Sequence, residues 1–182
     1  MGLRALVGTE GADGVYLARH VQHDGCPTMV VPALSVLLHE LCGHSPERAA
    51  AVLLQTDWSR LYAVPGTGPT GHAVGVPSEG YPVQTGRIAE ARAGDREWAY
   101  LFGGHRLHVY LGVFPERGPK RWEAWACWSL HELGDLSQLD LLEVQKAGYA
   151  AQWRASDYRG YMEAVREAAR DSTRIQLMEA GR

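Results

Sequence analysis

The segment EWAYLFGGHRLHVYL, residues 97–111, constrains the fold of this chain more than any other. Two apolar runs meet at Gly103-Gly104, and a glycine pair between such runs is typical of a β-hairpin with a two-residue turn. The alternation of side chains along a strand then predicts two faces. One face carries Trp98, Tyr100, Phe102, His105, Leu107 and Val109, and the other carries Ala99, Leu101, His108 and Tyr110. We expect the aromatic face to pack into the core, which leaves His108 on the more hydrated side.

Further strands are predicted on both sides of this hairpin. Residues 3–9 and 14–22 form a second hairpin, because EGADG between them places Asp13-Gly14 in a turn. Residues 83–91 are expected to add a strand to a central meander. The segment RWEAWACW, residues 121–128, suits either a fourth strand or a helix. Its tryptophans are expected in the core rather than on a stacking surface for a base or sugar.

Helices are predicted in four places. Pro27 and Pro32 are expected to interrupt the chain, and leucines at helical spacing begin only after Pro32. A second helix covers about 45–55, since Ser-Pro-Glu supplies a capping side chain and a first-turn proline. A third runs over 137–148 and ends at a glycine, and a fourth covers about 158–178. The predicted fold is therefore α+β, an antiparallel sheet made of the N-terminal hairpin plus the central meander, with helices packed on one face.

Residues 63–82 contain five glycines and four prolines, which argues against a helix or an interior strand there. Within a single domain spanning 1–182, a loop of this length is expected to be a functional lid or a mobile insertion. Its string GTGPTG, residues 66–71, matches the dinucleotide pattern G-x-G-x-x-G. Gly75 and Pro77 follow, however, and prevent the helix that would hold a pyrophosphate, so we expect no dinucleotide site.

The composition limits the classes of function. The chain has 18 basic and 21 acidic side chains with no basic stripe, which argues against nucleic-acid binding. No apolar run reaches the roughly 18 residues that a membrane helix needs, and the first residues match neither a signal peptide nor a myristoylation pattern. The three cysteines form no CxxC pair. A reduced, cytoplasmic protein without a membrane partner is therefore expected.

The string HELCGH, residues 39–44, invites comparison with zinc peptidases. It resembles the H-E-x-x-G-H signature of the dipeptidyl peptidase III enzymes, but no second glutamate-rich helix completes such a site. In a regular α-helix, residues five apart are separated by about 140° around the axis, so His39 and His44 should diverge. Gly43 and the Ser45-Pro46 pair instead predict the junction between two helices. Leu-His-Glu-Leu recurs at 130–133, and two copies do not make a repeat array.

The best candidate site in the sequence is the corner RHVQHDGCP, residues 19–27. A turn at Asp24-Gly25 would project three reactive side chains from one place, and the neighbouring strand contributes two further polar residues. The candidate ligand-binding residues are Arg19, His20, His23, Asp24 and Cys26, with His108 from the second hairpin. Histidines three apart, as in 20/23 and 105/108, point to opposite faces of a strand, so no metal site is predicted. The alternative is a simple turn in which Asp24 caps its own backbone.

Three segments of the chain resemble one known family. They are the opening strand MGLRALVG, the HDGCP corner followed by MVVPAL, and the EWAYLFGGHRLHVY hairpin with its downstream tryptophans. Together they resemble a family of small uncharacterised proteins of actinobacteria and their phages, in which a His-x-Asp-Gly-Tyr-Pro corner precedes a W-x-Y-L hairpin. Cys26 stands where that family more often has tyrosine, which argues against a thiol nucleophile. The resemblance implies fold and origin, and no activity or cofactor.

Two classes of function remain open. The first is a non-enzymatic binding or accessory protein, for which the resemblance implies a phage origin, with a small-molecule or protein partner and a site between the His23-Asp24 corner and the 63–82 loop. The second is a small metal-assisted hydrolase or transferase that uses His23 and Asp24, with His20 or His108 nearby. No complete catalytic set is visible in the sequence, which favours the first class.

Overall fold

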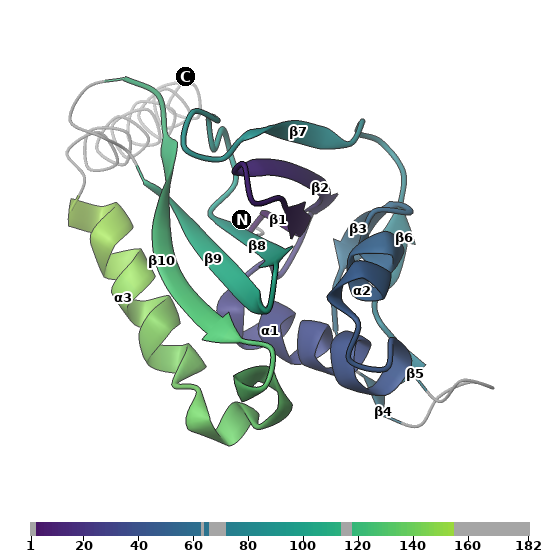
Figure 1. Cartoon of the computed structure of the whole chain (residues 1–182). Coiled ribbons are helices and arrows are strands. Elements are labelled where there is room, and N and C mark those ends of the chain that lie inside the picture. The colour runs from purple at the N-terminus through teal and green to yellow at the C-terminus, as the bar shows by residue number, and fades with distance from the viewer. Residues whose placement is uncertain (1–2, 63, 66–71, 114–117, 155–182) are drawn as a thin grey trace, which may run out of the picture.

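The computed structural model describes residues 3–62, 64–65, 72–113 and 118–154. The predicted helix over 158–178 and the glycine-rich string 66–71 lie outside these described residues. Within them, an eight-stranded sheet packs against three α-helices (Figure 1), and the predicted α+β class is confirmed. None of these helices is both long enough and apolar enough to cross a bilayer.

The sheet has the strand order β10-β9-β8-β1-β2-β3-β6, and β7 pairs with β2. The bounds are β1 Ala5–Glu10, β2 Val15–Val21, β3 Asp57–Arg60, β6 Val76–Ser78, β7 Gln84–Arg87, β8 Trp98–Gly103, β9 Arg106–Val113 and β10 Arg121–Ser129, with a separate ribbon of β4 Val64–Pro65 and β5 His72–Ala73. The predicted N-terminal hairpin is β1–β2, and the meander is β8–β9–β10. One strand was placed wrongly, because β7 joins β2 and not the meander.

The hairpin and the meander meet at a parallel pair of strands in the middle of the sheet. Ala5 of β1 lies opposite Trp98 of β8, and the pairing continues to Thr9 and Phe102. Parallel strands enter a sheet from the same edge. The residues before β1 and β8 are therefore neighbours, and the Glu97 N–H donates to the Arg4 carbonyl at 2.9 Å. This pairing, which the predicted antiparallel sheet did not include, places one wall of the site described below.

The aromatic face of the β8–β9 hairpin lies in the main core, as predicted. Trp98, Tyr100 and Phe102 are buried there with the apolar side chains of the helices, whereas His108 on the opposite face is half-buried. That opposite face has a smaller cluster of its own, made of Leu6, Tyr16, Ala18, Ile88, Ala93, Ala99, Leu101 and Trp122. The helices cover the first face, and the second face is left for loops and the site.

Residues 121–128 form part of strand β10, which decides the alternative that the sequence left open. Trp122 is buried on the face away from the helices. A register shift follows between Ala124 and Ala126. One extra residue in a strand reverses the alternation of sides. Trp128, which would otherwise share the face of Trp122, therefore packs against the main core, as Trp125 does. The expected location of these tryptophans in or against the core is confirmed.

Helix α1 spans Pro27–Val36 and contains Pro32, so the predicted interruption between the two prolines is wrong. Pro27 occupies the first turn, where its missing N–H costs nothing. An interior proline costs about 3 kcal/mol. Val30, Val31 and Leu34 are fully buried, and each contributes about 1.5–3 kcal/mol, which outweighs that cost.

The helix junction after α1 is confirmed, but the predicted divergence of its two histidines is wrong. Helix α1 continues into a π-helical turn, η1 Leu37–Leu41, and helix α2 begins after the Ser45 cap and spans Pro46–Leu53. A π-turn joins residues five apart. The Nδ1 atoms of His39 and His44 consequently lie 2.7 Å apart, where a regular α-helix would have separated the side chains.

Helix α3 spans Leu141–Arg154 and passes through Gly148, which was predicted to end it. The Asp140 carboxylate accepts the Glu143 N–H at 3.0 Å and caps the first turn. A Cβ atom at Gly148 would lie 2.4 Å from Cη2 of Trp98. This glycine therefore serves close packing of the helix on the sheet and not helix termination.

The described residues of the 63–82 segment, 64–65 and 72–82, form short strands only. Strand β6 lies at the end of the strand order, where Pro77 is tolerated because an edge strand has unpaired positions. After β6 the chain returns along β2, and Tyr81 comes to lie over His20. The described end of the glycine-proline segment thus forms part of a pocket.

Candidate functional site

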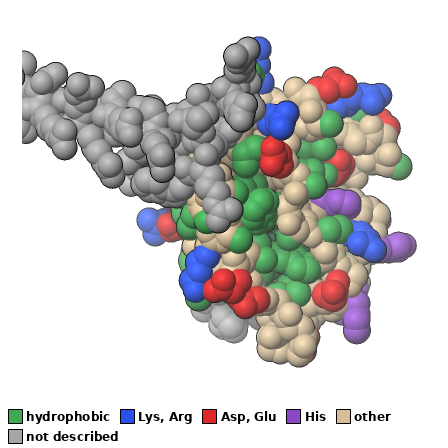
Figure 2. All heavy atoms as spheres, turned by 90° about the vertical axis from the view of Figure 1, so that its left-hand side faces the viewer, with side chains coloured by type: hydrophobic (Ala, Val, Ile, Leu, Met, Phe, Trp, Pro, Cys, Tyr) green, Lys and Arg blue, Asp and Glu red, His purple; other side chains and the backbone are tan. Residues whose placement is uncertain are grey.

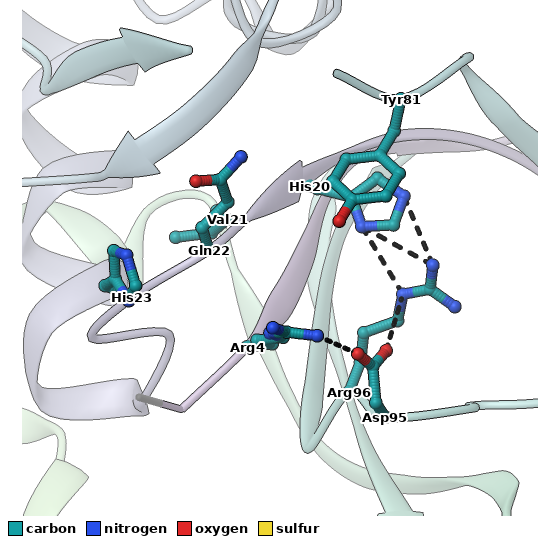
Figure 3. A pocket seen from close by; sticks show the side chains of 8 residues that line it. All are labelled: Arg4, His20, Val21, Gln22, His23, Tyr81, Asp95 and Arg96. Carbon is teal, nitrogen blue, oxygen red and sulfur yellow. Dashed lines mark hydrogen bonds and ion pairs between the residues drawn. The ribbon is translucent and has the colours of Figure 1, made fainter. Parts of the chain in front are cut away.

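The described residues form a small cavity at the end of β2, which we call the His20 pocket. Its volume is about 150 Å³, and it is lined by Arg4, His20, Val21, Gln22, His23, Tyr81, Asp95 and Arg96 (Figure 3). Four separate parts of the chain meet there: the residues before β1, the end of β2, the segment after β6, and the residues before β8. The central parallel pair brings the residues before β1 beside those before β8.

His20 is the most buried polar side chain of the pocket, at 5% exposure. It pairs with Leu6 in the β1–β2 register, so its side chain shares the face away from the helices. Its ring stacks on Tyr81 with centroids 4.4 Å apart. The strand pairing fixes the backbone of His20, and the tyrosine covers its ring.

Asp57, at the start of β3, holds these two residues together. It is 2% exposed. Its Oδ1 accepts the His20 N–H at 3.0 Å, and its Oδ2 accepts the Tyr81 N–H at 2.8 Å. A buried carboxylate with two charge-assisted hydrogen bonds is a strong tether. It is a positioning residue, since it does not line the pocket.

Arg96 forms the opposite wall of the pocket. Its guanidinium lies 3.2–3.5 Å from the ring nitrogens of His20, and Figure 3 shows it facing that ring. The Arg96 side chain is 19% exposed, and its nearest carboxylate oxygen among the described residues is Oδ1 of Asp95, at 3.8 Å. Asp95 also forms a close ion pair with Arg4. Two guanidinium groups therefore share one carboxylate.

The pKa values of two groups in the pocket, His20 and Asp95, are both lowered. Burial lowers the pKa of His20, the Arg96 charge lowers it further, and the Asp57 and Asp95 carboxylates only partly oppose this. Burial disfavours the charged form of Asp95, but the hydrogen bond and charge of Arg4, with Arg96, outweigh it and lower its pKa. Near neutral pH, His20 is thus uncharged and Asp95 ionised. Arg4, Arg96 and Asp95 together leave one net positive charge.

The structure brings two of the six candidate residues into this pocket, His20 and His23. Arg19 lies behind it, where its side chain donates to the carbonyls of Leu54 at 3.0 Å and Tyr81 at 2.8 Å. This arginine helps to position the covering tyrosine.

The remaining three candidates lie elsewhere. Asp24 has a left-handed φ of 56° and pairs with Arg60 at 3.1 Å, so no His23–Asp24 dyad is formed. Cys26 is buried at the start of α1, with its sulfur 3.5 Å from the Thr28 hydroxyl. His108 lines two other hollows, of about 240 and 360 Å³, on the β9 side of the sheet. The corner does not act as one cluster.

Five charged or aromatic residues of the site were missed from the sequence: Arg4, Asp57, Tyr81, Asp95 and Arg96. The charged string GDREW, residues 94–98, before an apolar strand was the one available signal for Arg96. Its meaning depends on the parallel pairing of β1 with β8, which local patterns do not encode. The role of Asp57 follows from its burial, which a single acidic residue before a short strand does not reveal.

A second surface feature lies on the side of α3 and β10. Figure 2 shows hydrophobic side chains exposed in a band on this side of the described residues, and Leu142 of α3 is 52% exposed. Exposed apolar side chains that gather on one side of a protein are typical of interaction sites.

No protein-family model, curated protein or solved structure matches the chain. The resemblance to small actinobacterial and phage proteins therefore stays a prediction, and the function must be argued from the geometry of the site.

Proposed function

We propose that this protein is a non-enzymatic binding protein that holds a small oxyanion, a carboxylate or a phosphate, in the His20 pocket. The ligand would lie against the Arg96 guanidinium, with the stacked His20 and Tyr81 rings as an adjoining wall.

The observation that carries the proposal is the incomplete pairing of Arg96. A guanidinium has five N–H donors, and a neutral imidazole offers only one accepting nitrogen. With Asp95 3.8 Å away, His20 is the main polar contact of Arg96 among the described residues. Several donors of a largely buried arginine are thus available. The planar fork of arginine suits carboxylate and phosphate oxygens.

The size and charge of the pocket support a small ligand. Its volume of about 150 Å³ is below the roughly 300–1,000 Å³ of pockets for drug-sized molecules. The one net positive charge would be matched by a singly charged anion. A short carboxylic acid of a few heavy atoms fits both limits. A small monophosphate ester fits the volume and carries up to one further negative charge at neutral pH.

Binding is proposed in place of catalysis because the lining residues contain no serine, threonine or cysteine to act as nucleophile. His20 has a lowered pKa that would suit a base, but both its ring nitrogens face the Arg96 guanidinium. The pocket therefore offers hydrogen-bond donors and a covering aromatic ring, which are features of a binding site.

The test is calorimetric titration of the full chain with a panel of small carboxylates, phosphates and matched neutral amides. We expect one saturable site for an anion and none for the amides. Arg96→Met should weaken binding roughly tenfold or more, since a hydrogen bond to a charged group contributes about 1.5–3 kcal/mol. The affinity of Arg96→Lys should lie between those of the unmodified protein and Arg96→Met, because lysine keeps the positive charge but lacks the planar fork of donors.

The matched control is Arg121→Met, because Arg121 is exposed and pairs with Glu123 outside the pocket. Its binding should equal that of the unmodified protein. Anion binding that Arg96→Met and Arg121→Met weaken equally, or a panel without any saturable anion, would refute the proposal. The carboxylate and phosphate arms separate the two possible ligand types.

A further inference from the structure

The histidine pair of the π-turn lies outside the His20 pocket and has no role in the proposed function. The Nδ1 atoms of His39 and His44 share a hydrogen bond of 2.7 Å, and their rings meet at 67°. One of the two nitrogens therefore carries a proton, which a chelated ion would displace into solvent. His39 is half-buried and His44 is exposed, so the pair is open to solvent on one side. Two imidazole nitrogens that point at the same place are the start of a metal site.

The local backbone creates this pair in two steps. The Cys42 N–H donates to the Leu37 carbonyl at 2.9 Å, which closes the five-residue π-turn. Gly43 and His44 then adopt left-handed φ values of 60° and 64°. A left-handed histidine is uncommon and costs free energy. Strained residues of this kind are concentrated at functional sites, as are π-turns.

We propose that His39 and His44 chelate a divalent late transition-metal ion of tetragonal preference, Ni²⁺ or Cu²⁺. With metal–nitrogen bonds of about 2.0–2.1 Å, two nitrogens at 90° would be about 2.9 Å apart, and at a tetrahedral angle about 3.3 Å. The observed 2.7 Å is closer to the first value, so adjacent positions of a square-planar or octahedral ion fit best.

The surroundings of His39 leave Nδ1 as the ring nitrogen that can face an ion. Its Nε2 is buried and has no hydrogen-bond partner among the described residues. The residue that follows the second Leu-His-Glu-Leu copy, Gly134, lies beside Cε1 and Nε2 of this ring. An ion could therefore be reached through Nδ1 and not through Nε2.

The segment around Gly134 packs on the His39 ring. A Cβ atom at Gly134 would be in ordinary van der Waals contact with Cε1 and Nε2 of His39, at 3.6 Å. The Ser35 hydroxyl donates to the Leu133 carbonyl at 2.5 Å and fixes the two segments together. The imidazole of His39 is therefore held in place before any ion arrives, which reduces the cost of chelation.

Water molecules would occupy the remaining coordination positions of an ion that is held by two protein nitrogens. Among the described residues, no group of three or more histidine, cysteine, aspartate or glutamate side chains is placed to hold one ion. For His39 and His44, the sequence prediction of no metal site relied on the geometry of a regular helix. The π-turn, followed by the left-handed residues Gly43 and His44, removes that reason.

The experiment is calorimetric titration of the full chain with Ni²⁺, together with electron paramagnetic resonance of the Cu²⁺-loaded protein. We expect one ion per chain and a copper spectrum with coupling to two imidazole nitrogens. His44→Gln should weaken the binding about tenfold or more, with one nitrogen coupling lost. His44 is exposed, so this variant should keep the fold, which circular dichroism verifies.

The matched control is His108→Gln, which removes a histidine from β9 and should leave affinity and spectrum unchanged. Equal affinity of the His44→Gln variant and the unmodified protein would overturn the proposal. So would a copper spectrum with one nitrogen or none in the unmodified protein. Neither result bears on the anion pocket, which shares no residue with this pair.

Discussion

At the scale of single residues, the site depends on one buried carboxylate. The Asp57 carboxylate accepts hydrogen bonds from the backbone N–H groups of His20 and Tyr81, which are 61 positions apart in the sequence. It thereby holds the covering ring in position over the pocket. Neither partner is a side chain, so the tether does not depend on the identity of its partners.

Asp57→Ala should destabilise the protein by about 2–5 kcal/mol, because it leaves one buried and one part-buried N–H group without an acceptor, and a buried group left unpaired costs about 1–3 kcal/mol. Asp57→Asn should cost roughly half as much, since the amide oxygen still accepts one bond. Urea unfolding measures both values. The control Asp13→Ala removes an exposed acceptor of one N–H, that of Val15, and should cost on the order of 0.5 kcal/mol. Equal losses at positions 13 and 57 would contradict the account.

His20 should make stability depend on pH in a defined direction. Its pKa in the folded protein is lowered, first by burial and then by Arg96. As the pH falls below about 6.5, the unfolded chain takes up the proton first, so stability falls. The slope from this single group is at most about 1.4 kcal/mol per pH unit. Above pH 7 it contributes no slope.

Urea unfolding between pH 7.5 and 5 tests this prediction. His20→Gln should shift stability at all pH values through lost packing and should show a shallower decline toward acid. Parallel stability curves for the unmodified protein and the variant would show that His20 does not titrate as described.

At the scale of elements, the errors of sequence-based prediction have a common cause. Capping patterns found the start of α2 correctly, because Ser45 accepts the Arg48 N–H through a local contact. The local pattern predicts a helix end at Gly148, but a glycine stands there because the Trp98 ring, 50 positions away, packs against the helix at that point. The local pattern also predicts a break at Pro32, but burial of the neighbouring side chains keeps Pro32 inside helix α1. Local signals predict local structure, and packing overrides them.

Gly148→Ala should destabilise the protein, although alanine favours a helix by about 1 kcal/mol. The added Cβ meets the Trp98 ring at 2.4 Å, and overpacking of this kind costs about 1–3 kcal/mol. Thermal unfolding measures the loss. In a Trp98→Leu background the same change should cost less, because the clashing atoms are gone. A stabilising effect in the unmodified background would disprove the packing role.

At the scale of the whole molecule, the parallel β1–β8 pair is the central connection. It joins the N-terminal hairpin to the meander and brings Arg4 beside Asp95 and Arg96. The two hairpins, the aromatic core face and the α+β class could be predicted from alternation and turn residues. The pairing between them could not, because no turn connects β1 with β8. The location of the pocket follows from that pairing, and so it was missed.

Hydrogen exchange should reflect this arrangement. Amides of β1 and β8, which are paired on both sides, should exchange most slowly, near the limit set by global unfolding. Amides of the edge strand β6 and of β7 should exchange faster through local opening. Uniform protection across the sheet, or faster exchange in β1 than in β7, would contradict the central place of this pair.

The most direct test of the anion pocket is a nuclear magnetic resonance titration that observes the Arg96 Nε–Hε signal. When the anion of the panel that binds most tightly is titrated, we expect a saturable shift of this signal, together with shifts at His20 and Tyr81. The affinity obtained from these shifts should equal the calorimetric one. Shifts confined to residues outside the pocket, or an Arg96 signal that does not respond at saturation, would contradict it.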